Sequence, residues 1–425
     1  MKRAIVMVWI LALVAAPAFA QKKKDKDKRG FVWDDRPTIV FGKNINVEFK
    51  GRALVEWRAF DPDQGEDLFH LRTARLGLKG KLTKHLSWEA EREVTGDDLS
   101  HIKAGDWKDV NVEWKTFRAF TARGGRFKMP FGMEQTTGIS DRVFFFNDTA
   151  TTEIAPARDK GGMISGDLRH FTYEAGVFHG DGDNGKSNEP QFVASGQKAD
   201  QVGPSVAIRA VGDLFRPLPL GKLRSANVGI AYTVADVPEG LNSLRAETVW
   251  GSNITKRVYV KGRRQRYGTQ FEWTPGSASI KAEWMQSREQ RKEQSNRDQD
   301  LSDYIGTAWY VTGTWFITGE KKENNIKVKH PLYKGGPGAI EVAARIEQLS
   351  FRSASTAGPA FTNPRADHLL PNSDTVFTVG INWTTSPWTR ILINAIHEDI
   401  EDPYRSPVSG TTAFWSGVLR LNIVF

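Results

Sequence analysis

The stretch NINVEFKGRALVEWRAF, Asn44–Phe60, alternates between two kinds of side chain. The odd positions carry Ile45, Val47, Phe49, Gly51, Ala53, Val55, Trp57 and Ala59. The even positions include Asn44, Asn46, Glu48, Lys50, Arg52, Glu56 and Arg58. Successive side chains of a strand point to opposite faces, so this period of two predicts one long strand with an apolar face and a polar face.

Segments with the same alternation recur to the end of the chain. They lie at roughly 68–82, 86–95, 107–116, 119–128, 159–168, 170–179, 204–213, 226–235, 262–274, 277–289, 303–318, 339–351, 374–385, 388–400 and 413–425. With the first stretch they make about 16 strands, an even number, as single-chain outer-membrane barrels have. The sequence therefore predicts an all-β fold, a 16-stranded antiparallel transmembrane β-barrel.

The connections between these segments alternate in length. Short turns lie at 83–85, 116–118, 169–170, 274–277 and 385–387, and long polar loops such as 289–300 and 353–374 fill other gaps. Two connections on the short side, 215–225 and 319–338, are long. Trp88, Trp273, Trp383 and Trp388 lie beside short turns, which predicts an aromatic girdle at one membrane interface. An array of soluble β-sandwiches would not need so many strands with Trp-rich apolar faces.

The N-terminus has the pattern of a secretory signal peptide. Lys2 and Arg3 precede an apolar run of 13 residues, Ala4–Ala16, and Ala18-Phe19-Ala20 fits a cleavage site. Residues 1–20 are therefore interpreted as the signal peptide of an exported protein, 21–40 as a basic, disordered leader, and 41–425 as the barrel domain. The chain has no cysteine, which excludes a disulfide-stapled scaffold.

The motifs of enzymes do not find support in this sequence. GDGDNGKS, Gly180–Ser187, fits the phosphate-cradling G-x-x-x-x-G-K-[ST] pattern, but Asn188-Glu189-Pro190 follows it where a helix is needed. A calcium loop from Asp181 would need Glu at its twelfth position, which is Phe192. A glycine-rich surface turn is therefore the favoured interpretation of Gly180–Ser187. No HExxH or G-x-S-x-G motif occurs, so we predict no enzyme, no metal and no cofactor.

Cations lie on the polar faces of the predicted strands, and the net charge is +9. They are Arg52, Arg58, Arg75, Lys79, Lys81, Arg126, Lys128, Arg209, Arg264 and Arg266. Acids share these faces: Glu48, Glu56, Glu89, Glu91, Glu113, Glu272 and Glu283. A lumen of mixed, self-compensating charge explains about half of them. An exported protein seldom meets nucleic acid, so the basic balance indicates another anion.

The stretch FTARGGRFKMPFGMEQTTGISDR, Phe120–Arg142, combines a broken strand with cations. Arg126 and Lys128, two residues apart, are expected to point the same way, and Pro130-Phe131-Gly132 then turns the chain out of the wall. A loop there is expected to fold into the barrel and narrow it. Cations at such a neck act where the field is focused, and the arginine fork suits phosphate oxygens.

Several stretches together resemble the phosphate-selective porin O and P family. They are LRTARLGLKGKLTKHLSWEAE at 71–91, GRFKMPFGMEQTTGISDR at 125–142, PARDKGGMISGDL at 156–168 and YEAGVFHGDGDN at 173–184. The resemblance implies a 16-stranded homotrimeric porin with a basic pore for inorganic phosphate or polyphosphate, and a loop after Pro130 that folds inward. By match of motif it gives Arg75, Arg126, Lys128, Arg142 and Arg158 as pore cations. The polar faces of the predicted strands add four further candidate pore cations: Lys79, Arg52, Arg58 and Arg209.

The stretch FFFNDTATTEI, Phe144–Ile154, departs from this pattern. It resembles a string that recurs in unrelated translated metagenomic sequences. The resemblance therefore carries no expectation for the chain between Arg142 and Ala155.

The expected function is a passive, anion-preferring porin in the outer membrane of a Gram-negative bacterium, in contact with outer-membrane lipid. Its expected solutes are phosphate, polyphosphate or other small anions. A plugged structural or adhesive barrel, a general porin without phosphate preference and a nucleotide-binding enzyme are the alternatives.

Overall fold

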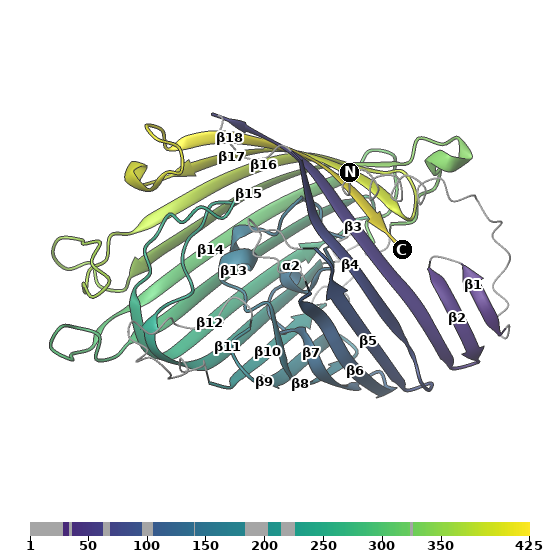
Figure 1. Cartoon of the computed structure of the whole chain (residues 1–425), viewed down its shortest axis with the longest axis horizontal. Coiled ribbons are helices and arrows are strands. Elements are labelled where there is room, and N and C mark those ends of the chain that lie inside the picture. The colour runs from purple at the N-terminus through teal and green to yellow at the C-terminus, as the bar shows by residue number, and fades with distance from the viewer. Residues whose placement is uncertain are drawn as a thin grey trace.

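A computed structural model of the chain describes residues 29–33, 36–62, 69–95, 105–139, 141–182, 203–213, 226–323 and 326–425 (Figure 1). The predicted closed antiparallel barrel of 16 strands, β3 to β18, is confirmed. The strands are β3 (Ile45–Asp61), β4 (Phe69–Lys81), β5 (Leu86–Glu93), β6 (Trp107–Phe117), β7 (Phe120–Lys128), β8 (Arg158–Asp167), β9 (Phe171–Phe178), β10 (Ser205–Gly212), β11 (Ala226–Leu241), β12 (Tyr259–Trp273), β13 (Ala278–Arg291), β14 (Leu301–Phe316), β15 (Ala339–Ser353), β16 (Asn372–Thr384), β17 (Thr389–Ile400) and β18 (Ala413–Val424).

The predicted strands correspond one to one with these elements. The largest difference is in β11, which continues to Leu241, whereas the alternation predicted an end at 235. Each strand pairs with its neighbour in the chain, and β18 closes the ring on β3 with Leu419 opposite Trp57.

The leader expected over 21–40 is corrected in its second half. β1 (Gly30–Trp33) pairs with β2 (Pro37–Gly42), and β2 pairs with the start of β3. This hairpin extends the sheet beyond the ring (Figure 1). Residues 21–28 and the signal peptide lie outside the described residues, as does the connection 215–225.

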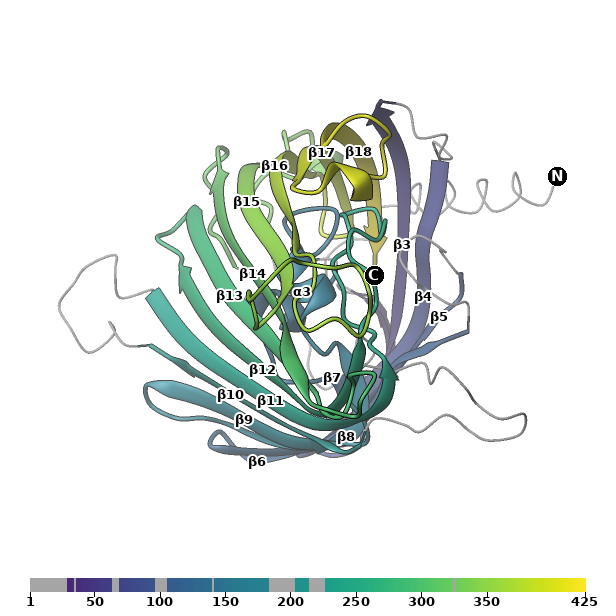
Figure 2. The same ribbon diagram turned by 90° about the vertical axis from the view of Figure 1, so that its left-hand side faces the viewer.

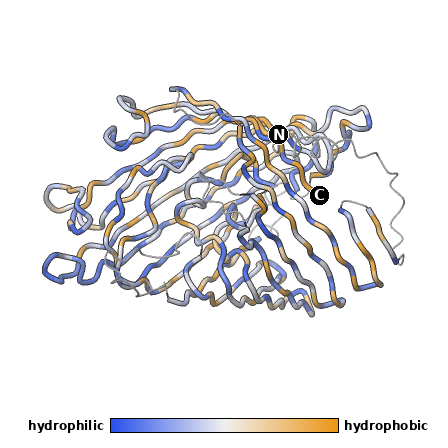
Figure 3. The backbone as a smooth tube through the Cα atoms, in the orientation of Figure 1, coloured by the Kyte–Doolittle hydropathy of each residue, from blue (hydrophilic) through white to orange (hydrophobic). Residues whose placement is uncertain are grey.

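The two faces of the wall have opposite character, and hydropathy alternates along the strands (Figure 3). The outer face carries exposed apolar side chains, among them Trp57 at 43 %, Leu76 at 60 % and Ile230 at 66 % exposed. The inner face carries buried charged side chains such as Arg58 and Arg75. This arrangement is the one that a lipid-facing outside and a polar inside require.

The interior holds chain as well as side chains. The connection from β7 to β8 contains the short helices α2 (Met133–Thr136) and α3 (Thr149–Glu153), and Figure 2 shows α3 within the ring of strands. Part of the connection from β11 to β12 is also buried, including Leu244, Ala246 and Ile254. Both segments form a hydrophobic core with Met285, Leu349 and other residues of β11 to β18. The core therefore lies on the inside of that half of the barrel.

The C-terminal Phe425 packs onto β3 at the seam of the ring. Its N–H donates to the carbonyl oxygen of Gly51 at 3.0 Å, and its carbonyl accepts from the Gly51 N–H at 2.9 Å. A Cβ at Gly51 would lie 2.0 Å from Cζ of the Phe425 ring.

Gly51→Val should therefore displace the terminal ring and reduce the fraction of chain that folds into a heat-resistant barrel. Gly313→Val is the matched control, because a Cβ at Gly313 in β14 meets nothing within 4 Å. The measurement is the heat-dependent shift in electrophoretic mobility of each variant. Equal folded fractions in the two variants would contradict a role for the Phe425–Gly51 contact.

Candidate functional site

The segment after β7 is held against the opposite wall by a carboxylate. The backbone N–H groups of Met133 and Glu134 donate to Glu283 of β13 at 2.5 and 2.9 Å, and the Tyr310 hydroxyl donates to the same carboxylate at 2.8 Å. Gly132, at φ 73°, permits this close approach, since a Cβ there would lie 2.7 Å from the Met285 side chain. The wall carboxylate thus replaces the hydrogen bonds that the loop amides would otherwise make with water.

The segment 242–258, between β11 and β12, is fixed in the same way. The Val249 N–H donates to Glu398 of β17 at 2.8 Å, and the Trp250 indole N–H donates to the Ser416 hydroxyl at 2.8 Å. We did not predict this segment from the sequence, which showed only a long loop. Its apolar residues Leu244, Trp250 and Ile254, unusual for a solvated loop, are the signal that was available.

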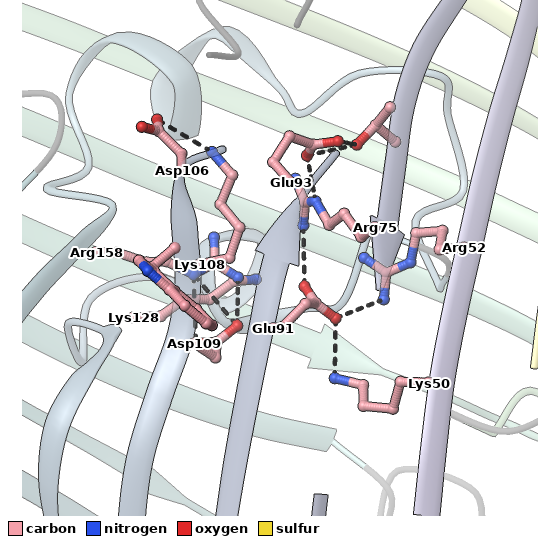
Figure 4. Close-up of polar contacts among 12 residues, drawn as sticks. Lys50, Arg52, Arg75, Glu91, Glu93, Asp106, Lys108, Asp109, Lys128 and Arg158 are labelled. Atoms are coloured by element: carbon pink, nitrogen blue, oxygen red, sulfur yellow. Dashed lines mark hydrogen bonds and ion pairs between the residues drawn. The ribbon is translucent and has the colours of Figure 1, made fainter. Parts of the chain in front are cut away.

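A cavity of about 400 Å³ lies between the 136–142 part of the first segment and the inner face of β3 to β9. Seven cations line it: Lys50, Arg52, Arg75, Arg123, Lys128, Arg142 and Arg158. Four carboxylates line it too: Glu89, Glu91, Asp109 and Glu174. Figure 4 shows Lys50, Arg52 and Arg75 around Glu91, and Lys128 and Arg158 beside Asp109. The lining therefore carries an excess of positive charge.

Several of these cations are paired with acids. The Arg75 Nε lies 2.6 Å from Glu93 and its Nη1 lies 3.4 Å from Glu91. The Arg158 Nη2 lies 2.8 Å from Asp109, and Arg123 pairs with Glu113. Such pairs hold the side chains in place and cancel much of their charge.

Three lining cations are compensated less. Arg52 reaches Glu91 only at 4.0 Å, and its Nε is buried without a hydrogen-bond partner. The Lys128 Nζ donates to a neutral group, the Thr137 carbonyl, at 2.5 Å. Arg142 has no carboxylate of the described residues within ion-pair distance, and its Nε is buried without a partner. These three side chains are the ones most available to an anion.

Arg142 keeps its charge in this environment. Burial lowers the pKa of its guanidinium to about 9, while Glu134 acts in the opposite direction. This pKa still lies above neutral pH, so the side chain remains cationic there.

The structure brings together five of the nine predicted pore residues, Arg52, Arg75, Lys128, Arg142 and Arg158. Lys50 and Arg123 also line the cavity, although neither was among the predicted nine. The predicted residues Lys79, Arg58 and Arg209 lie elsewhere on the inner face. Lys79 pairs with Glu48 at 3.4 Å, Arg58 with Glu56 at 2.8 Å, and Arg209 with Glu174 at 2.8 Å.

Arg126 requires a correction, because it lies on the outer face. Its register partner in β6 is Val110, which is 38 % exposed, and its Nε donates to the Trp107 carbonyl at 2.9 Å. The inner face of β7 is the one with Arg123 and Phe127. Lys128 reaches the cavity because it is the last residue of the strand, where the chain leaves the sheet.

The start of the GDGDNGKS motif makes structural contacts. The N–H groups of Gly180 and Gly182 donate to Asp159 at 3.0 Å each, and buried Asp181 accepts from Arg264 at 3.0 Å and pairs with Arg266. These two amides are therefore occupied by a carboxylate and do not form a phosphate cradle. Residues 183–190 lie outside the described residues.

Within the part of the chain that the structure describes, no three His, Asp or Glu side chains are grouped as metal ligands would be. In the same residues, no helix has the length and apolar character to cross a membrane.

Comparisons with known proteins agree with this architecture. The family model described as phosphate-selective porin O and P matches residues 55–413. Among solved structures, OmpT of Vibrio cholerae is similar with a TM-score of 0.56 and 12 % identity, covering 90 % of this chain and 98 % of that one. The anion-selective porin from Comamonas acidovorans is similar with a TM-score of 0.54 and 14 % identity, covering 89 % and 99 %.

The outer membrane channel DcaP of Acinetobacter baumannii is similar with a TM-score of 0.55 and 9 % identity, covering 94 % of this chain and 100 % of that one. A comparison with curated protein sequences finds no match. At these identities the solved structures support the fold.

Proposed function

Because the chain belongs to the phosphate-selective porin O and P family, we propose that it forms a passive, anion-preferring channel across the outer membrane of a Gram-negative bacterium. Family and fold indicate a channel rather than an enzyme. The single observation that carries the anion preference is the group Arg52, Lys128 and Arg142, whose charge is compensated less than that of their neighbours. A cavity lined in this way raises the local concentration of anions.

The segment from Met129 to Arg142 acts in this proposal as the constriction. Its docking on Glu283 puts Arg142 across the cavity from the cations of β3 and β4. A phosphate group is the proposed ligand of this site because the guanidinium fork of Arg52 and Arg142 matches its oxygens.

The test is the reversal potential of the purified protein in a planar bilayer under a KCl gradient. The expected sign is that of chloride preference, and added phosphate should reduce the chloride current in a saturable way. A potassium preference would end the proposal. Chloride preference without phosphate block would favour the general porin.

A plugged barrel is the second candidate, because two internal segments occupy the side of the lumen next to β11 to β18. Single-channel recording separates the two functions. Stepwise ohmic openings support a channel, and a barrel that folds but never conducts supports the plug.

Two further properties belong to the proposal. The signal peptide at 1–20 is removed on export, supported by its charged, apolar and small-residue regions. The channel is a homotrimer, supported by the trimer form known for OmpT, a structure similar with a TM-score of 0.54 and 12 % identity over 90 % of this chain. Chemical crosslinking in detergent and N-terminal sequencing of the mature chain test them.

Anion preference should rise as the pH falls below neutrality. Burial raises the pKa of the Asp141 carboxyl, which lies in the constriction beside Arg142, while Arg52 opposes this shift. A raised pKa means that the carboxyl takes up its proton at a higher pH than a free aspartate, and a negative charge near Arg52 and Arg142 is then lost. The measurement is the reversal potential at neutral pH and at about pH 5.

Asp141→Asn is the control for this pH effect. It should show higher anion preference than the wild type at neutral pH and a smaller change on acidification. An equal change in both proteins would assign the pH dependence to other carboxylates.

A further inference from the structure

The cavity is large for a bare phosphate ion. Its volume of about 400 Å³ falls in the range of sites for small organic ligands, roughly 300–1,000 Å³. A single phosphate between Arg52, Lys128 and Arg142 would leave most of that space to water. Side chains of Phe127, Ile139 and Met163 contribute an apolar part to the lining, which a phosphate ion cannot use.

The carboxylates of the lining are also unfavourable for inorganic phosphate. The side chains of Glu89 and Glu174 are 29 % and 26 % exposed, so part of each carboxylate remains open to the solvent of the cavity. Each is held by one cation, Glu89 by Lys50 and Glu174 by Arg209. A carboxylate has room for about four hydrogen bonds, so both retain acceptor capacity.

We propose that the cavity takes hydroxylated organic phosphates, the class of sugar phosphates, in preference to inorganic phosphate. The proposal rests on the anion-preferring channel proposed above and specifies its solute. The phosphate group lies among Arg52, Lys128 and Arg142. The hydroxyl groups of the same molecule donate hydrogen bonds to Glu89 and Glu174.

The two parts of the lining then have separate roles. Inorganic phosphate at neutral pH is a mixture of the monoanion and the dianion. Its one or two hydroxyl groups sit on the charged phosphorus centre itself, so a carboxylate that accepts a hydrogen bond from it also meets its negative charge. A sugar phosphate meets the same repulsion at its phosphate end but gains hydrogen bonds to charged acceptors at the other end, and these are stronger than bonds between neutral groups. The mixed charge of the lumen is therefore a means of recognition as well as of compensation.

The experiment measures block of the chloride current through single channels by inorganic phosphate, glucose 6-phosphate and glucose. In the wild type, glucose 6-phosphate should give half-block at a concentration roughly tenfold or more below that of inorganic phosphate, while glucose alone blocks weakly. The variants Glu89→Ala and Glu174→Ala should bring the ratio of the two half-block concentrations close to one. Taking the ratio cancels the electrostatic gain that both anions receive when a carboxylate is removed.

Glu272→Ala is the matched control, because Glu272 of β12 pairs with Lys281 at 3.1 Å and does not line the cavity. It should keep the wild-type ratio. Equal or stronger block by inorganic phosphate in the wild type would overturn the proposal. So would an unchanged ratio in both cavity variants that conduct.

If neither variant folds, the comparison of block by glucose 6-phosphate and by inorganic phosphate in the wild type is sufficient to test the proposal. The reversal potential in KCl reports the proposed anion preference independently of the blockers. A chloride-preferring channel that fails the ratio test refutes the solute class only, whereas a potassium-preferring channel refutes both proposals.

Discussion

In the double variant Lys128→Gln/Arg142→Gln, the ratio of chloride to potassium permeability should fall to near one, and block of the chloride current by phosphate should weaken by tenfold or more. The substitutions leave five cations facing four carboxylates in the cavity lining. Two unit charges 4 Å apart interact by about 1 kcal/mol in water and by about 4 kcal/mol at an effective dielectric constant of 20. Every 1.4 kcal/mol or so is a factor of ten in affinity, so losing two such contacts decides the selectivity.

The barrel itself should tolerate these changes. Arg142 makes no ion pair with a described carboxylate, and the Lys128 side chain contributes one hydrogen bond, to the Thr137 carbonyl. The matched control is Arg126→Gln/Lys160→Gln. Arg126 and Lys160 are register partners on the outer face of β7 and β8, so this variant removes the same charge outside the cavity.

The control should keep the wild-type reversal potential. If the Lys128/Arg142 variant folds and conducts with wild-type selectivity and phosphate block, the selective site lies elsewhere, and Arg75 and Arg158 are the next residues to replace.

Glu283→Ala should produce channels with larger and noisier single-channel conductance and lower anion preference. The substitution removes the acceptor of the Met133 and Glu134 amides and of the Tyr310 hydroxyl, at a buried position. Each buried donor left without a partner costs about 1–3 kcal/mol. The loop amides recover their hydrogen bonds only by moving into water, so the segment should leave β13 and widen the path.

Two variants calibrate this effect. Glu283→Gln keeps one amide acceptor and should give an intermediate conductance. Glu272→Ala removes one carboxylate from the inner face of β12 without touching a loop, and its conductance should match the wild type. A Glu283→Ala channel with wild-type conductance and selectivity would show that the segment is held by its apolar contacts alone.

The strands could be predicted from the sequence because one face of each strand meets lipid and the other meets the polar lumen. Lipid outside and a polar lumen inside impose a period of two, and stretches such as Asn44–Phe60 follow it closely. The orientation of β7 could not be predicted in this way. Its outer face consists of Phe120, Ala122, Gly124 and Arg126, which has too few large apolar side chains to mark it as the lipid side. Because both faces of β7 carry cations, no apolar face showed on which side of the wall Arg126 lies.

For the candidate site, the sequence predicted which kinds of residue line it but not which of them contact one another. The sequence shows that Glu283 lies on a polar face, but a carboxylate there can accept from an arginine or from a backbone amide. The choice depends on a segment that is 150 residues away in the chain. The same limit applies to Val249 and Glu398, separated by 149 residues, and it explains why the second internal segment was missed.

This separation along the chain also fixes an order of events during biogenesis. Five strands, β8 to β12, separate the constriction segment from β13, so the carboxylate that holds it becomes a docking point only when β13 is in place. Closing so long a loop costs entropy that is recovered only once the ring is in place. We therefore expect the selectivity of the channel to appear only after the wall that carries Glu283 has formed.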